Sequence, residues 1–258
     1  MKRLLLLLLT LPTLSVAATA FDGTWVADLK SAKLPEKPDV IVLNKGVFEC
    51  KTCVPALYLK ANGSDQAVTG NPNYDSAAVR IVNDHRLDTT YKLAGKIVSQ
   101  NNIAVSADGK TATIMSESHY GAKPVTATIT LTRVAGGPAG AHAYSGSWKM
   151  SAYEEVSKNG LSLTLRGSAD GLQLNDNNGM TYDAKFDGKD YPIAGDPTHT
   201  TVSLKRVDDR TIEETDKVAG KIEGVYRMTV AADGQSIATV YSDKRRGTTS
   251  QMTLRKQK

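Results

Sequence analysis

The two cysteines of this 258-residue chain, Cys50 and Cys53, have the spacing best suited to covalent chemistry. A Cys-x-x-Cys pair can serve as a structural disulfide, a redox centre or half of a metal site. A redox pair of the thioredoxin kind needs a helix start that stabilises the thiolate, whereas Val54-Pro55 and the strand-like stretch 56–61 follow here. Zinc needs two further ligands, and the sequence has no second cysteine pair or close histidine pair. The pattern favours a structural disulfide, with a redox pair and a metal site as alternatives.

The other residues that could do acid–base or metal chemistry form no constellation. The histidines have no ligand-like spacing: His85, His119, His142 and His199. Asp208-Asp209 and Glu213-Glu214 could form an acid–base pair, because neighbouring carboxylates split their pKa values. However, the aspartates occupy a turn position, and turn chemistry explains them. No nucleophile elbow or phosphate-binding loop is present. We therefore expect no enzyme, no metal site and no cofactor.

The elements that position these residues occur twice. Residues 63–109 align without a gap on residues 188–234, with 16 identities among 47 positions, mainly at turns. An aromatic-x-Gly-x-Trp motif opens each copy, ending at Trp25 in the first and Trp148 in the second. A period of this length fits a duplicated domain. We expect a first copy over residues 21–134, a Gly/Ala/Pro linker over 135–143, and a second copy over 144–258.

Residues 1–20 have the pattern of a targeting segment. Lys2-Arg3 precedes the apolar run Leu4 to Leu9, and the stretch closes on Ala18-Thr19-Ala20. No later stretch is long and apolar enough to span a bilayer. We therefore expect an exported protein, soluble after cleavage, in the bacterial periplasm or outside the cell. An oxidising compartment also suits the disulfide.

The charge pattern argues against a nucleic-acid partner. The chain carries 32 Lys and Arg against 27 Asp and Glu. A nucleic-acid binder concentrates its positive charge on one face. The one basic cluster, Lys244-Arg245-Arg246, precedes Gly247 between two strand-like runs. This position predicts a solvated hairpin tip.

Alternation of apolar and polar residues is the dominant pattern within the copies. The apolar members include Val125, Ala127, Ile129 and Leu131 in copy one, and Leu161, Leu163 and Leu165 in copy two. Such alternation is typical of strands with one buried face. Turn pairs such as Asp-Gly and Asn-Gly separate the runs. We predict an all-β protein made of two antiparallel up-and-down meander barrels of about 8–10 strands each, with β-sandwiches as the alternative.

The Gly-x-Trp openings resemble the calycins, the group of lipocalins and fatty-acid-binding proteins. In that group the indole lies at the closed end of the barrel under a basic side chain from the last strand. The resemblance implies floor pairs of Trp25 with Arg133 and of Trp148 with Lys256, since each cation has the inward phase of its strand. The turn motifs of the repeat also resemble a group of bacterial exported proteins of unknown function, which implies no activity.

The calycin resemblance implies a binding protein for a small apolar ligand, with access at the end opposite the tryptophans. Copy one is the better candidate for the cavity, because small Ala127 lies between Val125 and Ile129 on the inward face. These three residues are the expected ligand-lining set. The alternative is a structural or protein-interaction module with filled barrels. A thiol–disulfide redox protein is the third interpretation.

Overall fold

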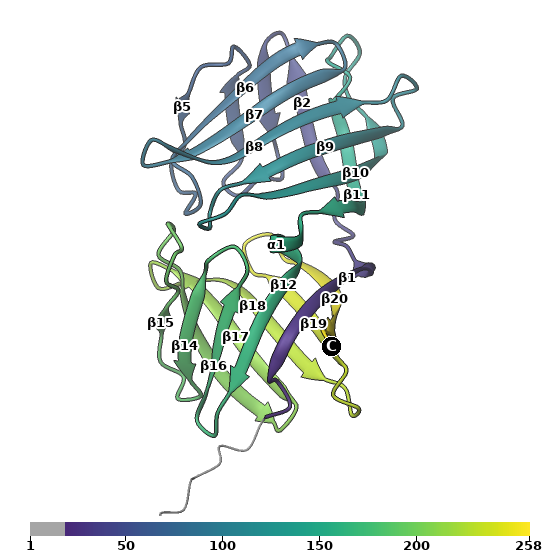
Figure 1. Cartoon of the computed structure of the whole chain (residues 1–258). Helices are drawn as coiled ribbons and strands as arrows, with labels where there is room; N and C mark the ends of the chain where they lie inside the picture. Colours follow the sequence, from purple (N-terminus) through teal and green to yellow (C-terminus); the bar gives the residue numbers. More distant parts are fainter. Residues whose placement is uncertain (1–18) are drawn as a thin grey trace, which may run out of the picture.

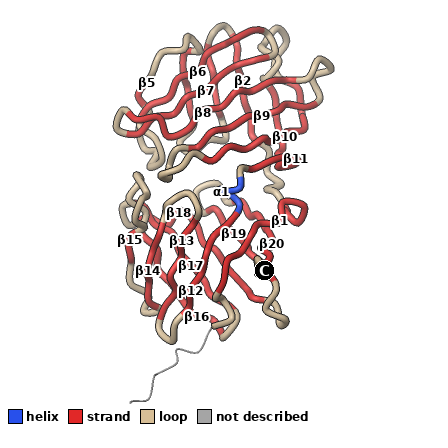
Figure 2. Tube along the Cα trace, viewed as in Figure 1, coloured by secondary structure: helices blue, strands red, loops and turns tan. Residues whose placement is uncertain are grey.

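The computed structural model describes residues 19–258. The predicted targeting segment therefore lies outside the described residues, apart from its last two positions. The described strands are β1 (Gly23–Lys33), β2 (Asp39–Asn44), β3 (Val47–Cys50), β4 (Leu57–Lys60), β5 (Gln66–Ala67), β6 (Ser76–Asn83), β7 (Arg86–Leu93), β8 (Lys96–Val105), β9 (Thr111–Ser118), β10 (Val125–Gly136), β11 (Gly146–Val156), β12 (Ser162–Gly167), β13 (Gly171–Asp176), β14 (Thr181–Lys185), β15 (Tyr191–Pro192), β16 (Thr201–Asp208), β17 (Thr211–Val218), β18 (Lys221–Val230), β19 (Ser236–Asp243) and β20 (Thr248–Lys256). One short helix, α1 (Lys158–Leu161), lies between the two groups of strands (Figure 2).

The strands form two antiparallel sheets of ten strands each, and each sheet curls into a nearly closed barrel (Figure 1). Barrel one has the strand order β4-β3-β2-β11-β10-β9-β8-β7-β6-β5. Barrel two has the order β14-β13-β12-β1-β20-β19-β18-β17-β16-β15. An isolated bridge spans the seam of each: Asn62 to Arg80 in barrel one, and Thr181 to Ala194 in barrel two. Curling in this way leaves few exposed strand edges, and the predicted barrel architecture is confirmed.

The two copies exchange their first strands. Strand β1, which opens the first sequence copy, pairs with β12 and β20 and thus belongs to barrel two. Strand β11, which opens the second copy, pairs with β10 and β2 and belongs to barrel one. Barrel one is therefore the continuous segment 39–156, while barrel two combines 23–33 with 162–256. The sequence boundaries 21–134 and 144–258 do not coincide with the barrels.

Residues 135–143 are correspondingly not a connection between barrels. They lie in the β10–β11 hairpin, within barrel one. The backbone N–H of His142 donates to the Leu43 carbonyl at 2.9 Å, and that of Ala143 donates to the Asp84 carbonyl at 3.1 Å. The chain crosses between barrels at two other places, residues 34–38 and residues 157–161. The Gly/Ala/Pro composition marks a hairpin loop here, because such residues suit either kind of connection.

Repeated turns explain the shared hairpins. Ala94-Gly95 joins β7 to β8, and Ala219-Gly220 joins β17 to β18. Their φ angles are 50° and 77° in the first turn and 49° and 75° in the second. Two successive positive φ values define the two-residue turn that matches the twist of paired strands, and the second residue is glycine in each.

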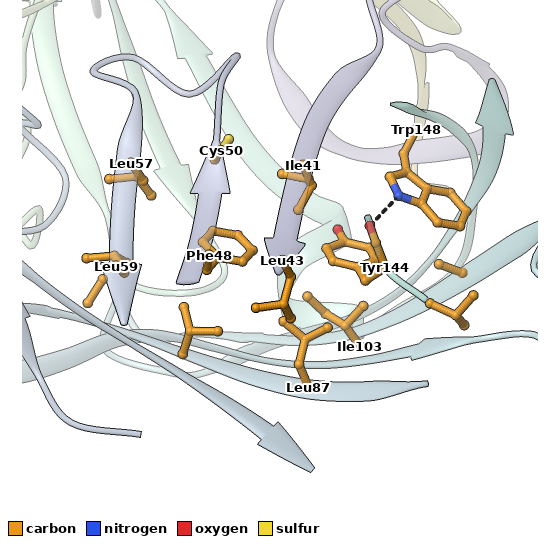
Figure 3. Packing of buried hydrophobic residues seen from close by; sticks show 14 of the residues in the cluster. Ile41, Leu43, Phe48, Cys50, Leu57, Leu59, Leu87, Ile103, Tyr144 and Trp148 are labelled. Carbon is orange, nitrogen blue, oxygen red and sulfur yellow. Dashed lines mark hydrogen bonds between the residues drawn. The ribbon is translucent and has the colours of Figure 1, made fainter. Parts of the chain in front are cut away.

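Inward-facing apolar residues fill each barrel separately. In barrel one the buried set includes Leu43, Phe48, Leu87 and Ile103, with Trp148 at one side of the cluster (Figure 3). In barrel two the corresponding set includes Leu165, Leu204, Ile212 and Ile237. The two cores share no residue, so each barrel is a separate packing unit.

Several polar contacts hold the barrels together. The tip of the β19–β20 hairpin reaches barrel one, where Arg245 donates to the Val54 carbonyl and Arg246 pairs with Asp39. On another side, the backbone N–H of Lys123 donates to the Asn178 carbonyl at 3.1 Å. Arg245 and Arg246 of the basic cluster are therefore contacts between barrels, whereas Lys244 is exposed, as predicted for a hairpin tip. Within residues 19–258, no helix is long and apolar enough to cross a membrane.

Candidate ligand-binding site

A cavity of about 650 Å³ occupies the interior of barrel two. Most of its wall is apolar, with contributions from Leu163, Leu174, Ile193, Met228, Met252 and Leu254. Residues from outside the barrel complete it: Leu34 and Pro35 from the first crossing segment, and Met150 and Tyr153 from β11. The cavity thus lies at the end of barrel two that faces barrel one, and that end is partly covered.

One row of inward side chains crosses the cavity wall. The strand register places Leu204, Glu214, Tyr226 and Tyr241 side by side on β16, β17, β18 and β19. Glu214 follows Ile212 by two residues, so alternation turns both toward the interior. The Glu214 side chain is buried, with 8% of the residue exposed. The Tyr182 hydroxyl on β14 donates a hydrogen bond to Glu214 Oε2.

A second carboxyl group lies behind the first. Asp216 is two residues further along β17, and its Oδ1 is buried without a hydrogen-bond partner in the described part of the chain. Burial, and then the neighbouring charge of Glu214, raise the pKa of Asp216 to about 8. Burial also raises the pKa of Glu214, against the effect of the Tyr182 hydrogen bond. At neutral pH the pair therefore holds at least one proton when no cation is nearby.

Tyrosine rings surround these carboxyl groups. The rings of Tyr226 and Tyr241 lie 4.3 Å apart between centroids, tilted by 31°. The ring of Tyr241 lies against Gly224, where a Cβ atom would collide with it. Burial raises the pKa of Tyr226, and burial followed by the charges of Asp243 and Asp216 raises that of Tyr241 to about 12. The tyrosines stay neutral at physiological pH and offer ring faces and hydroxyl groups.

Barrel one lacks this arrangement at the same ladder positions. The positions of Tyr182, Glu214, Tyr226 and Tyr241 correspond by register to Leu57, Thr89, Asn101 and Ser116. The position of Asp216 corresponds to Tyr91, whose ring packs against Tyr74 with 4.7 Å between centroids. Both tyrosines pack against the barrel-one core. Barrel one therefore has a tyrosine in place of Asp216 and smaller, uncharged residues at the other four positions.

The expected ligand-lining set is not at the barrel-two cavity. Ile129 packs against the barrel-one core. Ala127 lines a separate and more polar pocket of about 390 Å³, beside Gln100, Asn102 and Glu117. Val125 lines neither pocket. The bulges in the β10–β11 pairing, one of them between Thr128 and Ile129, interrupt the alternation on which that expectation depended. Of the copy-two residues, Leu163 lines the cavity and Leu165 lies in the core.

The barrel floors contain the expected four residues in exchanged pairs. The Arg133 guanidinium lies 4.0 Å from the ring centroid of Trp148, and the Lys256 ammonium lies 5.2 Å from that of Trp25. Both indoles are buried, and each donates from Nε1 to a backbone carbonyl at 2.8 Å, Trp25 to Phe21 and Trp148 to Tyr144. The predicted pairing of Trp25 with Arg133 and of Trp148 with Lys256 is therefore wrong. The partners are exchanged because the two copies exchange the strands that carry the tryptophans.

The cysteines form the predicted disulfide. The Cys50 and Cys53 sulfur atoms are bonded at 2.04 Å, and no free cysteine is present in residues 19–258. The disulfide lies where β3 ends, and Val54, which accepts a hydrogen bond from Arg245, follows it. Within the same residues, no group of three or more His, Cys, Asp or Glu side chains could hold a metal ion.

The other candidate residues are separated. His142 Nε2 lies 2.8 Å from the Asn83 carbonyl, and His119 lies 3.1 Å from Glu117. His85 and His199 are in turns or loops. Asp208 accepts the backbone N–H of Arg210 at 2.8 Å, as its turn position predicts. Glu213 pairs with Arg227 at 2.5 Å on the outer face, which separates it from Glu214.

Sequence reasoning missed the Glu214, Asp216 and Tyr182 cluster. The available signal was the phase of strand 211–218, in which Ile212, Glu214 and Asp216 share the inward face. The first copy has uncharged residues at both carboxyl positions, which also distinguishes the copies. Comparison with models of known families finds no match to this chain, and no curated protein matches it.

Proposed function

We propose that this chain is an exported, non-catalytic binding protein whose second barrel holds one small, largely apolar molecule. The observation that supports this proposal is the 650 Å³ cavity inside barrel two. Pockets for small ligands measure roughly 300–1,000 Å³ and combine apolar walls with a few polar groups. Barrels of this size hold one such ligand. The resemblance of the Trp-containing openings to calycins agrees with this role.

Export is part of the same proposal. The leader-like residues 1–20 and the Cys50–Cys53 disulfide both suit an oxidising compartment. A ligand would reach the cavity at the boundary between the barrels, since Trp25 and Lys256 occupy the opposite floor. Leu34, Pro35 and Arg246 line the cavity on that side, so the first crossing segment and the β19–β20 hairpin control access.

A titration with a neutral apolar dye, N-phenyl-1-naphthylamine, tests the proposal. Saturable binding to the protein without residues 1–20 is expected. Thr239→Trp places an indole in the cavity, and it should weaken dye binding by roughly tenfold or more. Ile114→Trp changes the corresponding position of barrel one, and it should leave the affinity unchanged.

Thermal unfolding of both variants shows whether each remains folded. Absence of saturable binding by the wild type would contradict the proposal. Equal losses in two folded variants would contradict the assignment to barrel two. Absence of binding would favour a structural or protein-interaction role, with which the filled interior of barrel one agrees.

A further inference from the structure

We propose that the ligand of barrel two is an amphiphilic amine, whose ammonium group binds the carboxyl groups of Glu214 and Asp216 while its hydrocarbon part lies against the leucine, methionine and tyrosine wall. This inference rests on the proposed binding function and specifies the ligand class. Four observations support it: two buried carboxyl groups, basic side chains that are paired elsewhere, tyrosine rings beside the carboxyl groups, and the absence of this arrangement at the corresponding positions of barrel one.

The carboxyl groups of Glu214 and Asp216 have no cationic partner among the described residues. Glu214 lines the cavity and accepts a hydrogen bond from the Tyr182 hydroxyl. Asp216 has a buried and unpartnered oxygen directly behind it. A buried carboxylate without a compensating charge is costly. A ligand that donates hydrogen bonds and carries positive charge would satisfy both groups.

Three basic side chains of barrel two, those of Arg245, Arg246 and Lys217, are paired elsewhere. Arg245 pairs with Glu223 at 3.2 Å, Arg246 pairs with Asp39, and Lys217 pairs with Asp190 at 2.6 Å. Among residues 19–258, no salt bridge includes Glu214 or Asp216. Arg246 is the one basic residue among those that line the cavity, and its guanidinium is held by Asp39. The carboxyl groups of Glu214 and Asp216 thus have no basic partner among the described residues, and a bound cation or protons would supply the complementary charge.

The tyrosines favour an organic ammonium over a metal ion. Tyr182, Tyr226 and Tyr241 line the same part of the cavity as Glu214, and their ring faces attract ammonium groups at short range. Two carboxyl groups are too few for the metal clusters described above. Leucine and methionine side chains form much of the remaining wall, which suits an alkyl or aryl body rather than a hydrated ion.

The two barrels provide an internal comparison. Both have the same fold, the same hairpins and a buried tryptophan floor. The carboxyl pair and its tyrosines occur only in the barrel that contains the large cavity, while barrel one has Leu57, Thr89 and Asn101 at the corresponding positions. Folding of this barrel architecture therefore does not require the buried acids. A binding role explains why they coincide with the cavity.

Binding of an ammonium group should be linked to proton release. The titratable groups that face Asp216 are Glu214 on β17, Tyr182 on β14, Tyr226 on β18, Tyr241 and Asp243 on β19, and Asp196 before β16. Among these, the carboxyl pair holds a proton in the empty cavity near neutral pH, and an incoming cation displaces it. The affinity for an amine should therefore rise from about pH 6 to about pH 8, while that for a neutral ligand stays level.

The test compares three ligands of equal chain length by calorimetry: decylamine, decanol and decanoate. We expect decylamine to bind roughly tenfold more tightly than decanol, and decanoate to bind more weakly than both. Glu214→Gln and Asp216→Asn should each remove most of the preference for the amine while decanol still binds. Asp209→Asn removes an exposed carboxyl group, and it should change nothing.

The outcomes separate the two proposals. If decanol binds as tightly as decylamine, or if both carboxamide variants keep the preference, the amine inference is wrong and the binding function stands. If none of the three ligands binds and the neutral dye also fails, the binding function is wrong and the inference falls with it. Retained decanol binding by Glu214→Gln and Asp216→Asn shows that these variants are folded.

Discussion

At the scale of single residues, each barrel floor combines an indole, a backbone carbonyl and a cation. The Arg133 guanidinium also donates to the carbonyl groups of Ser145 and Ala143, at 2.6 and 2.5 Å. The aliphatic stem of Lys256 lies close to Gly23, where a Cβ atom would collide with it. A buried indole therefore has its polar atom satisfied and its face covered, and each contact joins different strands.

Double-mutant cycles should detect the exchanged pairs. Trp148→Leu combined with Arg133→Met should show a coupling free energy of about 0.5–2 kcal/mol, because the cation lies over the ring. The sequence-based pair, Trp25 with Arg133, should be additive within about 0.3–0.5 kcal/mol, since these residues are in different barrels. Urea unfolding of the single and double variants measures both values. Coupling of Trp25 with Arg133 would contradict the strand exchange.

The Asp216 carboxyl group should make stability depend on pH. Its folded pKa of about 8 exceeds the unfolded value of about 3.9, so the folded state binds the proton more tightly. This contribution is fully present below about pH 4 and is lost as the pH rises through about 8. Asp216→Asn should therefore exceed the wild type in unfolding free energy at about pH 9, by an amount on the order of a few kcal/mol.

The measurement is urea unfolding from about pH 5 to about pH 9. Asp209→Asn, at an exposed turn position, is the matched control and should follow the wild-type profile. A wild-type profile that is unaffected by Asp216→Asn would show that this carboxyl group is not protonated in the folded protein.

Sequence alone predicted the identity of the floor residues but not their partners. The spacing of each tryptophan from its cation is the same in both copies. The inward phase of Arg133 and Lys256 therefore fits a pair within one sequence copy as well as a pair between the two copies. The burial of Glu214 could have been predicted from the phase of Ile212. The turn that explains Asp208-Asp209 ends before β17 begins, so it does not account for Glu214.

At the scale of elements, the exchanged strands connect the barrels more firmly than a linker would. In each barrel, one long strand with a buried tryptophan comes from the other sequence copy: β11 in barrel one and β1 in barrel two. Alternation, turn residues and strand count could all be predicted, because each depends on local sequence. Strand exchange could not, since β1 and β11 have the same opening motif and fit either barrel.

A cut in the β10–β11 hairpin should not release two separate domains. Residues 134–140 are exposed, so a protease site inserted between Pro138 and Ala139 should be cleaved. Each fragment would keep one strand of the other barrel, β1 in the first fragment and β11 in the second, and the fragments should remain together in gel filtration until denaturant is added. Separation in native buffer would contradict the observed strand order.

The segment from residue 37 to residue 158 should fold alone, because it contains every strand of barrel one. A segment of residues 21–134, which is the first sequence copy, lacks β11 and Trp148 and should be unfolded or aggregated. Circular dichroism and tryptophan fluorescence of the two segments decide between them. A cooperative transition for 21–134 and none for 37–158 would reverse the assignment.

At the scale of the whole molecule, the disulfide loop is part of the contact between barrels. Val54 follows Cys53 directly and accepts a hydrogen bond from Arg245, while Thr52 donates to Asp39, the partner of Arg246. Each arginine thus reaches a group that the disulfide loop positions. The contact joins the disulfide loop and Asp39, which follows the first crossing segment, to the β19–β20 hairpin at the mouth of the cavity.

Cys50→Ser combined with Cys53→Ser should cost at most about 1–2 kcal/mol, because the closed ring is short. Thermal unfolding under oxidising and reducing conditions measures this cost, and thiol labelling of the native wild type should find no free thiol. A loss well above this range, matched by Arg245→Ala alone, would instead assign the loop a larger part in holding the barrels together.

The discontinuity of barrel two has a consequence for the order in which the molecule assembles. Ribosomes deliver β1 first, but its neighbour β20 follows after more than two hundred intervening positions have been made. Barrel one can close as soon as β11 emerges, whereas β1 has no partner until β12 emerges and gains its second partner only with β20. Contacts between distant parts of a chain form slowly. The first of the described strands therefore pairs only after all the strands of barrel one have emerged, and the cavity is incomplete until β20 arrives.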